Sequence, residues 1–223
     1  QKNGVRCSAA RAFLSPVMGR PNLQVLTSAH TIRVVIENKR AVGVDYLQAG
    51  QRKTVRASRE VLLCAGAFGS PQILMLSGVG PAEELQSMGI PVLHHLPGVG
   101  RNLQDHPDFI FLNKSPSLDT FGISPAFTLK LWREWRSYMT QRRGMFTSNF
   151  AEAGAFFKSH PLQPIPDLQI HFVIGMVEDH ARKLLLGHGY SGHVCILRPK
   201  SRGMVRLATV NALDDPLIDV NML

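Results

Sequence analysis

The stretch LLCAGAFGSPQILMLSGVG, residues 62–80, decides how the central part of this chain folds. The apolar run over residues 61–66 is uninterrupted, which is typical of a strand that is buried on both faces. Ser70 is a favourable N-cap, Pro71 suits the first helical position, and Gly78 suits the position after a helix ends. The pattern therefore predicts a strand, a tight turn of small residues and a helix in immediate succession.

The predicted junction between strand and helix is a candidate binding site. Small residues at such a junction let a ligand lie against the backbone, and a helix N-terminus favours an anion. The same pattern also fits a junction that is merely closely packed. The residues alone support the two interpretations about equally.

Residues on both sides of this stretch supply further elements. Residues 6–14 have the apolar spacing of a short helix, which Ser15-Pro16 should end. Four runs that alternate or are rich in β-branched residues predict a small antiparallel meander, over residues 23–28, 32–37, 41–47 and 53–58. A second short helix is expected over residues 81–88, closed by Gly89, and a structured Gly-rich loop over residues 96–107.

The second half of the chain has a different pattern. Residues 125–143 form an amphipathic helical pattern that contains both tryptophans of the chain, Trp132 and Trp135. Strands are expected over residues 109–113, 153–158, 167–174, 193–199 and 204–209. No parallel βαβ units are evident, so this half predicts an antiparallel sheet with one long helix.

Composition excludes several classes of protein. Lys and Arg number 25 against 16 Asp and Glu, but the excess is spread along the chain without a recognition motif, so we expect no nucleic-acid partner. Cys7, Cys64 and Cys195 lack the spacing of a disulfide framework or a zinc site, so no metal is expected. No apolar run reaches the length of a transmembrane segment. These features favour a cytoplasmic protein, with membrane association left open.

Two long stretches resemble a known family. REVLLCAGAFGSPQILMLSGVGP (59–81) and GIPVLHHLPGVGRNLQDHPD (89–108) are similar to the central signature region of the glucose–methanol–choline (GMC) flavoprotein oxidoreductases. The likeness is strongest to the choline-dehydrogenase-like alcohol dehydrogenases. It continues through four further motifs: RCSAARAFL (6–14), RPNLQVLTSAHTIRVV (20–35), RRGMFTSNFAEAGAFF (142–157) and LRPKSRGMVRLAT (197–209).

The resemblance implies a mixed α/β and α+β fold in two parts. Residues 1–108 would be part of an FAD-binding, Rossmann-like domain that includes an antiparallel β-meander. Residues 109–223 would be part of a substrate-binding domain built on an antiparallel sheet with helices. The implied cofactor is FAD, and the implied activity is oxidation of a small-molecule alcohol, choline-like or another primary alcohol, by hydride transfer to the flavin. Oxidase or dehydrogenase, the electron acceptor and the mode of flavin attachment stay open.

The resemblance also implies where the cofactor would lie. Residues of the junction and of the Gly-rich loop would be beside the flavin, and one residue of the meander would contact the adenine through its backbone. These cofactor-binding candidates are Thr31, Ala65, Gly66, Ala67, Asn102, Leu103, Gln104, Asp105 and His106.

Two parts of the family pattern are missing from these residues. There is no GxGxxG motif after an early strand to hold the FAD pyrophosphate. No segment matches the one that carries the family's catalytic His, so that base is expected beyond Leu223. We therefore expect an internal fragment of a longer enzyme, inactive as an isolated chain. The alternatives are a truncated, non-catalytic paralogue that acts as a binding module and, with less support, a nicotinamide-dependent dehydrogenase.

Several residues are candidates for the missing chemistry. His106 is the best substitute base because its loop would lie near the flavin, although a role in shaping that loop is the stronger expectation. Glu152 could hold a cationic alcohol with help from Trp132 or Trp135, but the stronger expectation is that Glu152 starts a half-exposed strand and the tryptophans pack the long helix. His171 reads as a core residue. His180, His188 and His193 flank a loop without a complete ligand set for a metal.

The expected incompleteness has a consequence for stability. Apolar strands without neighbours, such as residues 61–66, leave exposed sheet edges and apolar patches. We expect the isolated chain to be marginally stable or to self-associate.

Overall fold

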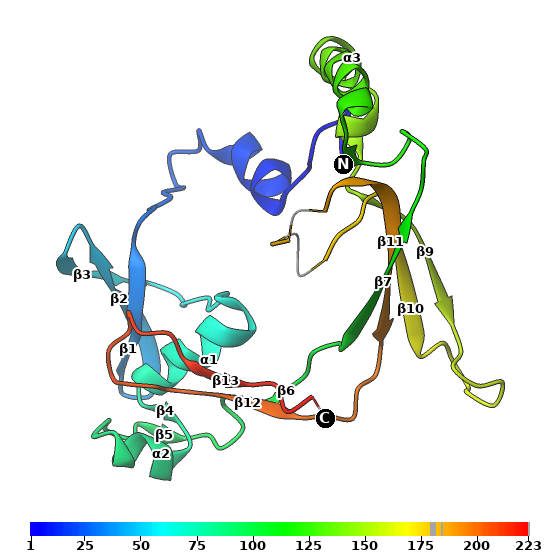
Figure 1. Cartoon of the computed structure of the whole chain (residues 1–223). Coiled ribbons are helices and arrows are strands. Elements are labelled where there is room, and N and C mark those ends of the chain that lie inside the picture. Colours follow the sequence, from blue (N-terminus) through cyan, green and yellow to red (C-terminus); the bar gives the residue numbers. More distant parts are fainter. Residues whose placement is uncertain (179–181, 184, 223) are drawn as a thin grey trace. The chain divides into compact units, whose positions relative to one another are not determined.

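The computed structural model describes residues 1–178, 182–183 and 185–222 and divides the chain into two compact units (Figure 1). Unit 1 contains residues 1–24 and 106–198, and unit 2 contains residues 25–105 and 199–223. The chain passes from unit 2 to unit 1 at residues 105–106, close to the expected domain boundary at residue 108. The assignment of a cofactor role to one part and a substrate role to the other stays a prediction.

Unit 2 begins with a three-stranded antiparallel meander. Its strands are β1 (His30–Glu37), β2 (Arg40–Gln48) and β3 (Gln51–Arg56), in the order β1-β2-β3. Asn38 and Lys39 both have positive φ, which is the geometry of the tight two-residue turns that join hairpin strands. Three of the four expected strands are confirmed. The strand expected over residues 23–28 is wrong: Ser28 has a φ of 52°, which interrupts an extended run.

A buried carboxylate ties the meander together. Asp45 of β2 is 4% exposed and accepts hydrogen bonds from Thr54 at 2.6 Å, from Arg52 at 2.5 Å and from Arg33 at 2.9 Å. Burial by itself would raise the pKa of Asp45. The hydrogen bonds from Thr54, Arg52 and Arg33 outweigh burial and hold that pKa well below its usual range. The carboxylate therefore stays ionised and binds β1, β2 and β3 to one another.

The buried strand expected over residues 60–66 is wrong. Residues 60–65 form neither a helix nor a strand, and Leu62 is 75% exposed. An apolar run becomes a central strand only where strands lie on both sides of it. The apolar run is present in the sequence, but the described residues contain no strand that pairs with it.

The helix after this segment begins earlier than expected. α1 spans Gly66–Leu76 with Ala65 as its N-cap, so Ser70 and Pro71 lie inside the helix and not at its start. The Ser70 hydroxyl oxygen instead accepts the backbone N–H of Ala65 at 3.1 Å, which replaces part of the capping that it was expected to provide. The end of the helix is as expected, with Gly78 at a φ of 80°.

The rest of unit 2 packs around α1. The elements are β4 (Val79–Gly80), α2 (Ala82–Ser87), β5 (His94–His95), β6 (Arg101–Leu103), β12 (Gly203–Arg206) and β13 (Leu217–Asp219). β4 and β5 pair in parallel, and β13-β12-β6 form a small sheet. The core consists of Met75, Leu85, Val99 and Leu207, with Met75 and Leu85 each only 1% exposed.

Unit 1 is built on an antiparallel sheet, as expected for the second half of the chain. Its elements are η1 (Ala10–Leu14), η2 (Ser15–Val17), β7 (Asp108–Lys114), β8 (Gly122–Ile123), α3 (Pro125–Gln141), η3 (Met145–Thr147), β9 (Ala151–Phe157), β10 (Leu168–Val173) and β11 (Gly187–Ile196). The strand order is β7-β11-β10-β9, with β8 paired to one end of β11.

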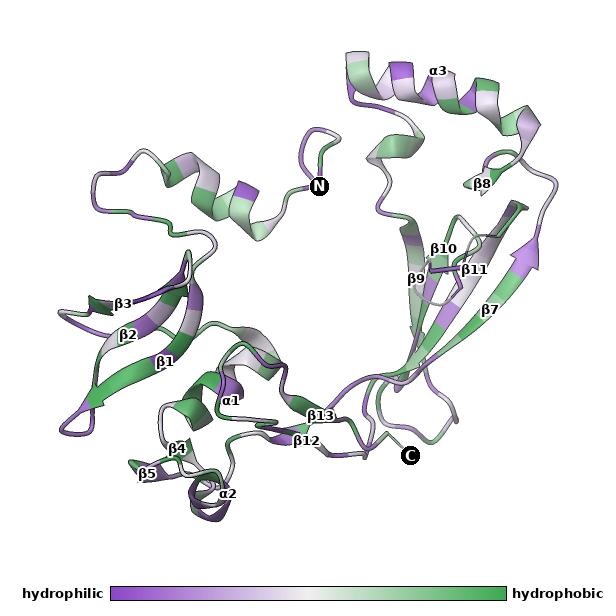
Figure 2. Ribbon diagram, turned by 60° about the vertical axis from the view of Figure 1, so that its left-hand side comes forward, coloured by the Kyte–Doolittle hydropathy of each residue, from purple (hydrophilic) through white to green (hydrophobic). Residues whose placement is uncertain are grey.

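The long helix α3 confirms the amphipathic helix expected over residues 125–143. It ends at Gln141, two residues earlier than expected. The Ser124 hydroxyl oxygen caps it by accepting the N–H of Phe127, and Arg142 ends it in the left-handed conformation. Hydrophobic and hydrophilic residues interleave along the helix (Figure 2). The short helix expected over residues 6–14 is only partly confirmed, because regular structure begins at Ala10 and continues through Pro16.

Candidate functional site

The principal candidate is a cavity of about 500 Å³ at the N-terminal end of α1, called here the α1 cavity. It lies wholly within unit 2. Its lining comes from the first turns of α1, from β6 with its flanking loop, and from β12. The lining residues are Gly66, Ala67, Ser70, Pro71, Gly100, Arg101, Asn102, Leu103, Gln104 and Val205.

Two glycines give the α1 cavity its shape. Gly66 has a φ of 77° and opens the helix in a conformation that other residues rarely adopt. Gly100 has a φ of 75°, and a Cβ atom there would collide with the carbonyl oxygen of Val205. That close approach lets the Val205 N–H donate to the Gly100 carbonyl at 2.7 Å, which joins β12 to the Gly-rich loop.

The electrostatics of the α1 cavity favour an electron-rich or anionic group. The first backbone N–H groups of a helix have no acceptor within the helix, and the helix dipole adds positive potential there. Arg101 is the charged residue of the lining, and its guanidinium is held by the carboxylate of Glu84. No acidic side chain is among the lining residues.

The structure brings together some of the nine predicted cofactor-binding residues. Gly66, Ala67, Asn102, Leu103 and Gln104 line the α1 cavity. Thr31 and Ala65 instead line a separate cavity of about 270 Å³, together with His30, Gln72 and Ala212 among others. Asp105 and His106 line neither cavity, and they stand at the passage from unit 2 to unit 1. A flavin role for the nine residues stays a prediction.

Unit 1 holds a second candidate, a cavity of about 320 Å³ on one face of the sheet, called here the sheet cavity. Polar groups and apolar groups both line it. The lining residues are Asp108, Asn149, Phe150, Ala151, His171, Val173, Val177 and His193. Its size is that of a pocket for a small molecule.

A row of hydrogen bonds runs beside the sheet cavity. The Ser191 hydroxyl donates to the carbonyl of Gly175 at 2.9 Å and lies 3.2 Å from Nε2 of His193. Nδ1 of His193 lies 3.2 Å from a carboxylate oxygen of Asp108. The imidazole ring of His193 is therefore held at both nitrogens, by the Ser191 hydroxyl on one side and by the Asp108 carboxylate on the other.

This row is a positioning device and not a nucleophilic triad. Ser191 is fully buried, so no substrate can reach its hydroxyl. The contacts of Ser191 and Asp108 fix the ring of His193. His171 is the cross-strand neighbour of His193 and lines the same cavity. Among the described residues, no side-chain hydrogen bond of His171 is recorded. It is the imidazole that can meet a ligand.

Sequence reasoning missed this cluster, although the strand alternation contained the signal. Ser191, His193 and Cys195 are two residues apart and therefore share one face of β11. Burial raises the pKa of the Cys195 thiol, and the nearby carboxylate of Asp108 raises it further. What the sequence could not supply was the register that sets Asp108 opposite Cys195 and His171 opposite His193.

The remaining candidate residues of unit 1 have other places. Glu152 is exposed on β9, next to Ala151, and does not line the sheet cavity. Neither Trp132 nor Trp135 lines it, and a contact of either ring with a cationic alcohol stays a prediction. His188 is buried, and its two ring nitrogens lie 2.8 Å from the Ser124 hydroxyl and 3.0 Å from the Thr120 carbonyl, which leaves neither for a metal. His180 lies outside the described residues.

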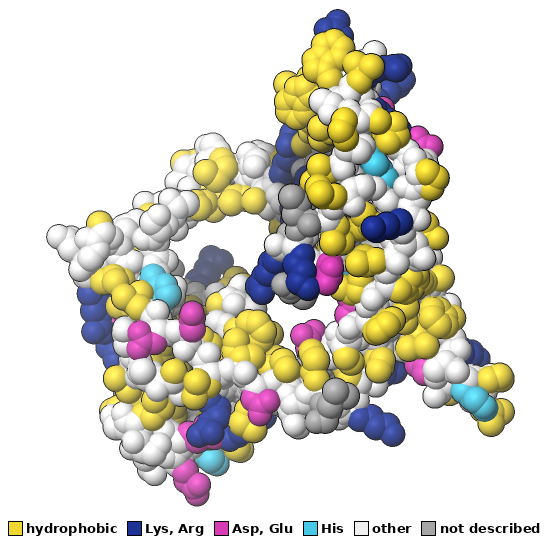
Figure 3. Space-filling model, in the orientation of Figure 1, with side chains coloured by type: hydrophobic (Ala, Val, Ile, Leu, Met, Phe, Trp, Pro, Cys, Tyr) yellow, Lys and Arg dark blue, Asp and Glu magenta, His cyan; other side chains and the backbone are white. Residues whose placement is uncertain are grey.

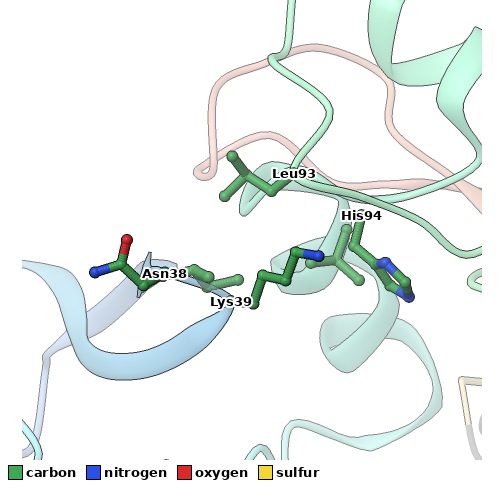
Figure 4. Close-up of a pocket in the computed structure, with 6 residues that line it drawn as sticks. Asn38, Lys39, Leu93 and His94 are labelled. Atoms are coloured by element: carbon green, nitrogen blue, oxygen red, sulfur yellow. The ribbon is translucent and has the colours of Figure 1, made fainter.

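A third cavity, of about 380 Å³, has different chemistry (Figure 4). The β1–β2 turn supplies Asn38 and Lys39, and the other wall includes Leu93 and His94. None of the predicted cofactor-binding residues lines it. It offers a single ammonium group and one imidazole among aliphatic side chains.

Comparison with known proteins places the chain in a family. Residues 1–108 match the family described as GMC oxidoreductase. The alcohol dehydrogenase [acceptor] of Pseudomonas putida is 47% identical over 100% of this chain and 41% of its own length. The mitochondrial choline dehydrogenase of Mus musculus is 41% identical over 99% of this chain and 37% of its own length.

Solved structures give the same relation. Formate oxidase from Aspergillus oryzae superposes with a TM-score of 0.81 and 26% identity, over 92% of this chain and 41% of that protein. An FAD-dependent oxidoreductase from Chaetomium thermophilum superposes with a TM-score of 0.76 and 25% identity, over 97% of this chain and 44% of that protein.

The chain belongs to the GMC oxidoreductase family. The resemblance to choline-dehydrogenase-like alcohol dehydrogenases and the mixed fold with antiparallel sheets are confirmed. The chain spans about two fifths of the length of the curated relatives it matches. Among the residues that the structure describes, no helix combines the length and hydrophobicity that crossing a bilayer requires.

Proposed function

We propose that this chain supplies one wall of the flavin cleft and part of the alcohol-binding sheet of an FAD-dependent oxidoreductase that acts on CH–OH groups. The observation that carries the proposal is the α1 cavity, where five of the nine residues expected beside the flavin share one lining. The family relation and the alcohol and choline dehydrogenases among the relatives support it.

The lining of the α1 cavity fits part of FAD. The cofactor carries electron-rich carbonyl and phosphate oxygens, and the cavity offers them the amino end of α1, while the guanidinium of Arg101 is already paired with Glu84. Gly100 admits the close approach of the Val205 backbone, and Gly66 leaves open space at the start of the helix. When bound, FAD supplies the capacity to accept a hydride from the alcohol carbon.

The residues of this chain would then bind and orient. The α1 turn and Asn102 to Gln104 would hold one edge of the cofactor through backbone groups. The sheet cavity would receive the alcohol: His171 would accept or donate a hydrogen bond at the hydroxyl oxygen, and Phe150 and Val173 would exclude water from the carbon being oxidised. We assign the removal of the hydroxyl proton to none of these residues, since His193 is committed to Ser191 and Asp108.

Binding of FAD to the full 223-residue chain tests the proposal. We expect saturable quenching of flavin fluorescence. We also expect Ala67→Trp, which places an indole in the α1 cavity without changing a glycine, to weaken binding by at least about tenfold. The matched control is Phe68→Trp, at the next position of α1, which does not line the cavity. It should bind FAD like the unchanged chain.

Equal loss of binding in both variants would mean that the substitutions damage the helix and not the cavity. Unchanged binding in Ala67→Trp would place the flavin elsewhere and contradict the proposal. A chain that binds a small ligand at the α1 cavity but not FAD would favour the binding-module alternative.

A further inference from the structure

One face of α3 is apolar and uncovered. Leu129 is 68% exposed, Trp132 60%, Met139 51% and Trp135 50%. These four residues lie at spacings of three, four and seven along the helix and so share a single face. Yellow and dark-blue side chains gather over this helix in the space-filling view (Figure 3). Large apolar side chains on a protein surface are ordinarily scattered singly, whereas these four lie next to one another.

The opposite face of α3 is the one that packs. Phe127 is 4% exposed and meets the ring of His188 edge-on. Tyr138 contacts Phe146, and Glu134 accepts the backbone N–H of Met145 at 2.8 Å. Trp135 also meets the ring of Phe146 edge-on, so one residue of the exposed face shares in this packing.

Positive charge borders the apolar face. Arg133 lies at its edge, Arg136 lies between Leu129 and Trp132 within the face, and Arg142 and Arg143 follow the end of the helix. Among the ion pairs recorded between described residues, none uses Arg133, Arg136 or Arg143. The one acidic residue of α3, Glu134, is turned to the packed side. The face thus combines large apolar side chains with one arginine among them and others beside them.

We propose that this face of α3 docks the protein on an anionic lipid surface. A helix that lies in a membrane interface has Trp and Leu on one face and Lys or Arg beside it, which is the pattern here. Indole rings favour the headgroup region, and each arginine gains from anionic headgroups. A second copy of the chain would bring like charges together, and a nucleic acid would gain nothing from Leu129 and Met139.

The chain carries its own probe for this surface. Its two tryptophans, Trp132 and Trp135, are both on the exposed face, so intrinsic tryptophan fluorescence reports on α3 alone. The full chain should be mixed with vesicles of phosphatidylcholine and phosphatidylglycerol, and separately with vesicles of phosphatidylcholine alone. We expect a shift of emission to shorter wavelength and quenching by brominated lipid with the anionic vesicles only, both reduced by added salt.

A matched pair of variants separates this face from the general positive charge of the chain. Arg133→Glu with Arg136→Glu should lower vesicle binding at least about tenfold. Arg11→Glu with Arg20→Glu makes the same change in net charge at exposed residues outside α3, and should bind nearly as the unchanged chain does. All four changes are at exposed positions, so circular dichroism should show the same fold.

Three results would overturn the proposal. They are no emission shift with anionic vesicles, equal binding by both double variants, and a blue-shifted, concentration-dependent dimer without lipid. The last would assign the face to a second copy of the chain. None of these outcomes depends on whether the chain binds FAD, because the readout is the tryptophan emission of α3.

Discussion

The α1–α2 region of unit 2 and the sheet of unit 1 use similar apolar residues in opposite ways. Met75 and Leu85 are each 1% exposed and share a core with Val99 and Leu207. In the sheet, Phe109 is 70% exposed and Phe156 63%. Apolar character alone does not decide burial. What decides it is whether the described residues provide something to pack against.

The presence or absence of packing partners also explains the segment at residues 60–65. Its composition is that of a buried strand, but its Leu62 is 75% exposed. This exposure also bears on the expectation of marginal stability or self-association for the isolated chain. The exposed apolar residues of the sheet and of this segment are what such self-association would use. The expectation stays a prediction.

The largest expected effect tests the difference between core and sheet directly. Met75→Ala should lower the free energy of unfolding by about 2–5 kcal/mol, because it opens a cavity in the core. Phe156→Ala removes a larger side chain from a mostly exposed position and should change it by no more than about 0.5 kcal/mol. Urea denaturation followed by circular dichroism measures both. Equal losses would mean that the face around Phe156 is covered in solution.

A smaller effect is expected at Asp45, where the meander depends on charge and not on apolar packing. Asp45→Asn should cost about 1–3 kcal/mol, since Arg33, Arg52 and Thr54 lose an ionised partner in a buried place. The pKa of Asp45 is lower in the folded chain than in the unfolded chain. The stability it confers is therefore present above about pH 4 and is lost as the pH falls below that value.

The pH dependence gives the control for this prediction. Unfolding measured between about pH 2 and pH 6 should show a slope for the unchanged chain that is smaller in Asp45→Asn. Asp119, whose pKa is lowered by its exposed contact with Lys130, provides the comparison. Asp119→Asn should alter the slope less, because solvent screens that pair. A slope unchanged by Asp45→Asn would show that Asp45 does not hold the meander.

The smallest expected effect is a difference in the labelling rates of two thiols, which leaves stability unchanged. Cys64 is exposed in the unpaired segment, whereas Cys195 is buried and its pKa is raised by burial and by Asp108. A thiol reagent near pH 8 should label Cys64 rapidly and Cys195 only when urea is added. Mass spectrometry of the peptides distinguishes them. Protection of Cys64 in the native chain would indicate that the segment at residues 60–65 is covered.

The sequence by itself determined the elements whose signals are local. Three strands of the meander, the helices α2 and α3, and the end of α1 at Gly78 follow from turn residues, caps and periodicity. The family relation also followed from motifs in order along the chain. The start of α1 also depends on neighbouring residues, but the sequence offered two places for Ser70. Ser70 lies inside the helix, where its hydroxyl oxygen accepts the backbone N–H of Ala65, and not at the N-cap.

Only the tertiary structure decided how distant residues meet. No local signal sets Gly100 against Val205, so the sequence predicted half of the residues that line the α1 cavity but not how they come together. Likewise, β11 places Ser191 and His193 on one face, but the register with β7 and β10 brings Asp108 and His171 to them. Strand register and the supply of packing partners depend on contacts far apart in the chain, and those contacts decide which apolar and polar residues become core, cavity or surface.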